Sequence, residues 1–91
     1  MATIPPVLVT VNDRAAAELM VDIMGKDYGA VLGEADGEPL VEVVPIDDTR
    51  RGVVLYRVIQ ASRTVAARFP DAKLYLLTEE GSRWRLPPPA L

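Results

Sequence analysis

The sequence predicts an α+β domain, in which a two-layer, ferredoxin-like β-α-β-β-α-β sandwich is followed by a short C-terminal hairpin strand. Three observations predict this class. Residues 49–69 keep a helical apolar period, the pair Asp36-Gly37 separates two strand-like segments, and β-branched residues alternate over residues 7–11. A chain of 91 residues provides too few helices to cover both faces of a doubly wound sheet. We therefore expect one domain over residues 1–91, with two helices on one face of an antiparallel sheet.

Local signals predict the first strand and the first helix. Residues 7–11 place β-branched side chains at every odd position, which is typical of a strand with one buried face. Asn12 or Asp13 can cap the helix that follows, and either Gly25 or Gly29 can close it in a left-handed conformation. The apolar side chains that share the inner face of this helix are Ala16, Leu19, Met20, Ile23 and Met24.

A β-hairpin is predicted around Asp36-Gly37, because a type I′ turn needs positive φ at both central residues. The flanking strands are expected over residues 30–35 and 40–46, and the turn fixes how they pair. The resulting pairs are Leu32 with Val41 and Ala30 with Val43 on the core face, and Val31 with Glu42 and Gly33 with Leu40 on the other face.

Residues 49–69 form the predicted central helix, which begins after the capping acids Asp47 and Asp48 and stops at Pro70. Its inner face is expected to contain Val54, Leu55, Val58, Ile59, Ser62, Val65, Ala66 and Phe69. Its flank collects Arg50, Arg57, Thr64 and Arg68. One side of this helix is therefore expected to be core and the other basic.

Two short strands are expected to complete the sheet, one over residues 73–78 and one over residues 83–86, with a turn at Glu80-Gly81 or Gly81-Ser82 between them. Trp84 either packs on the core from this edge strand or serves as an interface anchor. The proline-rich tail at residues 87–91 is expected to be flexible.

The composition excludes several classes of chemistry. The chain has no cysteine and no histidine, so thiol proteases, zinc fingers and histidine-based triads are excluded. Gly25-Lys26 is not a phosphate loop, because Met20 and Asp27 stand where that motif needs glycine and Ser or Thr. No serine or tyrosine has a base at a defensible spacing, and the acidic residues match no metal-binding loop. We predict no catalytic residue, no metal site and no cofactor.

Charge is distributed unevenly along the chain, whose net charge is −3. Residues 1–48 carry two bases and ten acids (−8), whereas residues 49–91 carry eight bases and three acids (+5). Such an asymmetry of charge bears on which partners a protein associates with, and not on its fold. In a two-fold dimer we expect the acidic hairpin around Glu34, Asp36 and Glu38 to meet Arg83 and Arg85 of the other copy, because the predicted fold places these regions at opposite sheet edges.

These observations predict a non-enzymatic binding or regulatory module that forms a homodimer and binds a protein partner. The open sheet face is more apolar than a solvated face requires, so the dimer interface is assigned to Val31, Leu40, Tyr75 and Leu77. The residues assigned to partner binding are Arg50, Arg57, Arg68, Arg83, Trp84 and Arg85.

Two alternatives stay open. One is binding of nucleic acid or a phosphate ligand through the basic flank of the second helix, which the sequence pI of about 4.8 and the lack of a stacking aromatic pair disfavour. The more distant one is a small enzyme of unknown type. The longest apolar runs are four residues, far below the ~18 of a spanning helix, and the start has no basic leader, so we expect a cytoplasmic protein without membrane contact.

Overall fold

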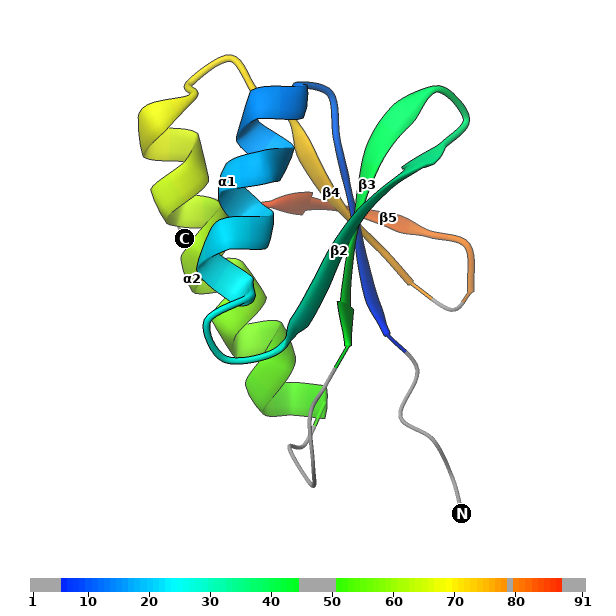
Figure 1. Cartoon of the computed structure of the whole chain (residues 1–91). Coiled ribbons are helices and arrows are strands. Elements are labelled where there is room, and N and C mark those ends of the chain that lie inside the picture. Colours follow the sequence, from blue (N-terminus) through cyan, green and yellow to red (C-terminus); the bar gives the residue numbers. More distant parts are fainter. Residues whose placement is uncertain (1–5, 45–50, 79, 88–91) are drawn as a thin grey trace.

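The protein is an α+β fold with one five-stranded antiparallel sheet and two helices on one of its faces (Figure 1). The computed structural model describes residues 6–44, 51–78 and 80–87. The elements are β1 (Val7–Val11), α1 (Arg14–Met24), β2 (Gly29–Ala35), β3 (Glu38–Val44), α2 (Arg51–Arg68), β4 (Leu74–Leu77) and β5 (Arg83–Leu86). Across the sheet the strands lie in the order β2-β3-β1-β4-β5, so the first strand of the sequence is the middle strand. The predicted class, sheet type and helix number are confirmed.

The hairpin of β2 and β3 has the turn that the sequence predicts. Asp36 and Gly37 both have positive φ, 52° and 81°, as a type I′ turn requires. All four predicted residue pairs are observed in the register of these strands. β2 begins at Gly29 and β3 at Glu38, slightly before the predicted starts, and the predicted end of the third strand lies outside the described residues.

The hairpin of β4 and β5 depends on a glycine in the left-handed region. Gly81 has φ of 87°, and its N–H donates to the Thr78 carbonyl at 3.0 Å while the Thr78 N–H donates to the Ser82 carbonyl at 2.9 Å. The fifth strand has the predicted bounds, whereas β4 is one residue shorter at each end than predicted.

Helix α1 is capped at its start by Asp13, whose carboxylate accepts hydrogen bonds from the backbone N–H groups of Ala15 and Ala16 at 2.9 and 3.3 Å. Its predicted left-handed closure is wrong for both candidate glycines. Gly25 is right-handed, with φ of −68°, and Gly29 is already the first residue of β2. The helix ends instead in a tight turn, in which the Met24 carbonyl accepts a hydrogen bond from the N–H of Tyr28 at 2.9 Å.

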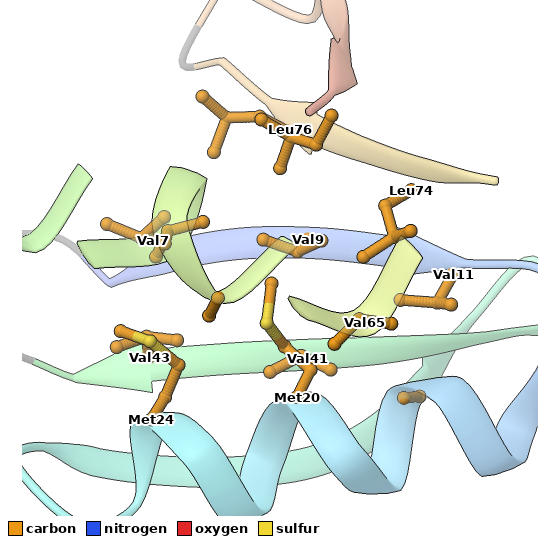
Figure 2. Packing of buried hydrophobic residues seen from close by; sticks show 14 of the residues in the cluster. Val7, Val9, Val11, Met20, Met24, Val41, Val43, Val65, Leu74 and Leu76 are labelled. Carbon is orange, nitrogen blue, oxygen red and sulfur yellow. The ribbon is translucent and has the colours of Figure 1, made fainter. Parts of the chain in front are cut away.

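The core lies between the helices and the covered face of the sheet (Figure 2). Strands β1, β3 and β4 contribute alternate residues, namely Val7, Val9, Val11, Val41, Val43, Leu74 and Leu76, all of which are buried. The predicted inner face of α2 is confirmed, since Val54, Val58, Ser62 and Val65 are fully buried and the other members are half-buried. The Ser62 hydroxyl donates to the Ile59 carbonyl at 2.6 Å, so this buried polar group is satisfied within the helix. The predicted start of the helix and its capping acids lie outside the described residues.

Candidate functional site

The described secondary structure leaves the sheet face opposite the helices uncovered. Two rows of side chains cross it: Val31, Glu42, Leu8, Leu77 and Arg83 in one, and Gly33, Leu40, Thr10, Tyr75 and Arg85 in the other. The four residues that the sequence assigns to a dimer interface therefore share one face. On the middle strands this open face carries Leu8, Leu40, Tyr75 and Leu77 together with the polar residues Thr10 and Glu42, and two arginines lie on the β5 edge.

Arg83 bridges the open face. Its Nη2 lies 3.4 Å from Oε2 of Glu38 on β3 and 3.4 Å from Oγ1 of Thr10 on β1. Its guanidinium carbon lies 5.2 Å from the ring centroid of Tyr75, within the range of a cation–π contact. Thr10 is only 3% exposed although it faces away from the helices, which is consistent with the cover that the arginine side chain gives it.

This bridge bears on one prediction made from the sequence. Arg83, which the sequence assigns to a contact with the acidic hairpin of a second copy, pairs with Glu38 of its own chain. Arg83 therefore already has an acidic partner, and the intermolecular contact stays a prediction. The twist of the sheet explains why Arg83 reaches Glu38 of its own chain. Because of this twist, the β2-β3 and β4-β5 hairpins project to the same side of the sheet, away from the helices (Figure 1).

A groove of about 510 Å³ lies between these two hairpins on the open face. Its lining includes the apolar side chains of Leu8 and Leu77, and the Arg83 side chain reaches across it to Glu38. The remaining lining residues are Thr10, Ala35, Asp36, Glu38, Thr78 and Gly81. Leu8 and Thr10 were not singled out as site residues from the sequence. Both residues occupy even positions of a strand whose odd positions face the core. This alternation in the sequence indicates that they lie on the open face.

Arg85 lies beside Arg83 over the same aromatic ring, with its guanidinium carbon 5.8 Å from the Tyr75 centroid. Its side chain is exposed, and within residues 6–44, 51–78 and 80–87 no carboxylate lies within ion-pair distance of it. A guanidinium that stacks on a ring keeps its N–H groups free to bind a carboxylate in the plane of the fork. Among the described residues, Arg85 is therefore a cation of the open face, beside the groove rather than in its lining, that can bind an incoming anion.

The basic residues of α2 lie on the other side of the molecule and do not form one continuous strip. Arg57 is paired with Asp27 at 3.1 Å, so the loop after α1 neutralises it. Arg63 and Arg68 border a shallow hollow of about 500 Å³ on the outer surface of the helix. Arg50 lies outside the described residues. The predicted partner-binding cations are thus divided between the open face and the helix side.

Trp84 contradicts the prediction of core packing, because it is 62% exposed. It lies on the same sheet face as the helices, opposite Leu76, at the outer edge of the sheet. With Leu55 and Leu76 it borders a second groove, of about 470 Å³. Of the β5 residues only Leu86 is buried, so this edge strand anchors to the core by one side chain. The alternative role of Trp84 as an interface anchor stays a prediction.

Comparison with known proteins adds nothing to the geometry: no protein family, curated protein or solved structure matches this chain. Within the described ranges, no three acidic side chains gather closely enough to hold a metal ion. None of the described helices has the length and apolar character needed to cross a membrane. A functional assignment therefore has to come from the surfaces described above.

Proposed function

We propose that the protein is a non-enzymatic binding module that holds a segment of another protein in the groove of its open face. The groove between the two hairpins supports this most directly. It combines an apolar floor with an arginine held in place by Glu38 and Tyr75. A second arginine, Arg85, lies beside the groove over the Tyr75 ring and has no acidic partner among the described residues. A concave apolar surface with a few fixed polar groups at its rim is typical of a binding site.

The side chains suggest what this segment contains. Leu8 and Leu77 favour apolar side chains on the floor, and Arg85 favours a carboxylate next to them. Asp36 in the groove lining disfavours a strongly acidic segment, whereas Glu38 is already paired with Arg83. The expected ligand is thus a mixed segment with apolar residues and an acid at the end that lies over Tyr75.

The fold supports the same proposal. We infer a ferredoxin-like split βαβ arrangement with β5 added beside β4; the order β2-β3-β1-β4 and the helices on one side of the sheet support this inference. In such an arrangement one sheet face stays free to bind a partner. The homodimer expected through Val31, Leu40, Tyr75 and Leu77 would use the same face and stays a prediction. A cytoplasmic location stays a prediction.

Photo-crosslinking tests this proposal. A benzophenone amino acid at Tyr75, on the open face, is expected to form adducts with a partner protein in cells, and the same group at Tyr56, exposed on α2, is expected not to form them. Arg85→Glu in the Tyr75-labelled chain should reduce the adduct at least tenfold, since it places a repelling charge at the groove. Arg63→Glu on the helix side is the matched control. Identical adducts from both labelled positions, or adducts indifferent to Arg85→Glu, would contradict the proposal.

The hollow between Arg63 and Arg68 favours a second candidate, which is binding of phosphate groups of nucleic acid on the helix side. If so, the chain should bind single-stranded or duplex nucleic acid at low salt, and the affinity should fall steeply as salt rises. Arg63→Glu with Arg68→Glu should abolish this binding, whereas Arg83→Glu with Arg85→Glu should change it little. No shift of a labelled oligonucleotide at low salt would remove this candidate.

A further inference from the structure

Strand β2 forms one edge of the sheet and carries seven residues. Figure 1 shows it as the outermost strand, and in the part of the chain that the structure describes it pairs only with β3. An edge strand presents unpaired backbone N–H and C=O groups along its outer side. The outer side of β2 is therefore free to pair with another strand in the part of the chain that the structure describes.

The hairpin register shows which backbone groups point outward. In a two-residue hairpin the residues that flank the turn, here Ala35 and Glu38, form a hydrogen-bonded pair, and such pairs alternate along the ladder. The residues of β2 that bond inward to β3 are thus Gly29, Val31, Gly33 and Ala35. Ala30, Leu32 and Glu34 direct their N–H and C=O groups to the open edge. These three residues offer a regular row of donors and acceptors.

The two edges of the sheet differ in how they discourage pairing. β5 is four residues long, carries two arginines and is followed directly by Pro87. Short length, positive charge and proline are common means of blocking an edge. β2 is longer, contains no proline or basic residue, and has Glu34 as its one charge. The β2 edge has none of the protections found at β5.

We propose that β2 pairs with β2 of a second copy of this chain, antiparallel and about a two-fold axis through Leu32. In this register Leu32 lies opposite Leu32 of the second copy, and Ala30 lies opposite Glu34. All three outward residues of each copy are then matched, which gives about six backbone hydrogen bonds between the copies. Shifting the register by two residues in either direction leaves outward groups unmatched.

The side chains of β2 fit this register on the open face. Val31 is 56% exposed and would lie opposite Gly33 of the second copy, in a non-hydrogen-bonded pair where the side chains approach most closely. A Cβ built on Gly33 meets only one atom, the Leu40 carbonyl oxygen at 3.9 Å, so there is room beside it for a neighbouring valine. Each valine would cover the other copy's glycine, and the only charge, Glu34, would lie opposite alanine. The edge is therefore complementary to itself in backbone, shape and charge.

Such a dimer is distinct from partner binding in the groove. A two-fold axis between antiparallel edge strands is perpendicular to the sheet, so both open faces point to the same side. The two grooves stay accessible, and one continuous sheet spans both copies. Substitutions in β2 should then abolish self-association without affecting partner binding, and substitutions in the groove should do the reverse.

Disulfide trapping tests the register directly, since the natural chain has no cysteine. In the proposed pairing, residues 31 and 33 of opposite copies have Cα atoms about 4.5 Å apart, within the range that a disulfide spans. Val31→Cys with Gly33→Cys is expected to give a covalent dimer under mild oxidation, and Val31→Cys alone is not. Equal cross-linking by the single variant, or none by the double variant, would overturn the proposal.

A backbone test complements the trapping experiment. Glu34→Pro removes an outward N–H without removing a bond to β3, and Glu34→Ala removes the same charge but keeps the N–H. By analytical ultracentrifugation we expect Glu34→Pro to raise the dimer dissociation constant roughly ten- to thirty-fold, since two symmetric hydrogen bonds are lost. Glu34→Ala should leave the constant within about threefold of wild type. A wild type that stays monomeric at millimolar concentration, or a dimer broken by Leu77→Asp but not by Glu34→Pro, would rule out the β2 interface.

Discussion

Val58→Asp is expected to leave the protein largely unfolded. The Val58 side chain is fully buried in the inner face of α2. A carboxylate there would be a charge without a partner in the core, a change whose cost commonly exceeds about 4 kcal/mol. Domains of this size are stable by only about 5–15 kcal/mol, so a loss of this size removes much or all of the folded population.

Circular dichroism and the dispersion of amide proton signals measure this effect. Gln60→Asp is the matched control, because it introduces the same side chain two residues later on the exposed face of the same helix. We expect this variant to lose less than about 1 kcal/mol, mainly through helix propensity. A Val58→Asp protein with the wild-type spectrum and melting temperature would mean that the inner face of α2 has been misassigned.

Leu74→Ala is expected to have the next largest effect, a loss of about 2–5 kcal/mol of unfolding free energy. Leu74 is fully buried on β4, between the middle strand and β5, and faces the helices. Its removal creates a cavity that the flanking strands cannot close without losing their register. The effect should appear as a lower urea midpoint with an unchanged slope, because the surface exposed on unfolding stays nearly the same.

Leu77→Ala makes the same chemical change three residues later, on the open face of the same strand. Leu77 is only half-buried, so we expect a loss of about 1 kcal/mol or less. The difference between the two variants measures how different the two faces of the sheet are. Equal losses would mean that the open face is covered in solution, and the groove would then be unavailable to a partner.

The β2-β3 hairpin could be predicted from the sequence because its determinants are local. Asp36-Gly37 permits only a few backbone conformations, and that choice fixes every pair along the two strands. The inner faces of both helices were predictable for the same reason, since a period of 3.6 residues depends on neighbours in the chain. Local signals did not decide the end of α1, where Gly25 closes the helix without a left-handed residue.

The site was less predictable because twist and edge position act over long sequence distances. The pair Arg83 and Glu38 joins residues 45 positions apart, and no pattern in the sequence indicates that the two hairpins lean toward each other. The exposure of Trp84, where core packing is predicted, has a related reason. A tryptophan on an interior strand would be buried, but on β5 the helices cover only the Leu86 end of the strand.

The central position of β1 determines when the sheet can be completed during synthesis. Val7–Val11 leaves the ribosome before the other described strands, yet its neighbours are β3 and β4, and the second of these ends at Leu77. The nascent chain therefore holds an apolar strand with an unsatisfied side until β4 has emerged. The local hairpin of β2 and β3 can form early and pair with one side of β1, while the other side waits for β4. We expect premature termination before Leu74 to yield a product that chaperones retain and proteases remove.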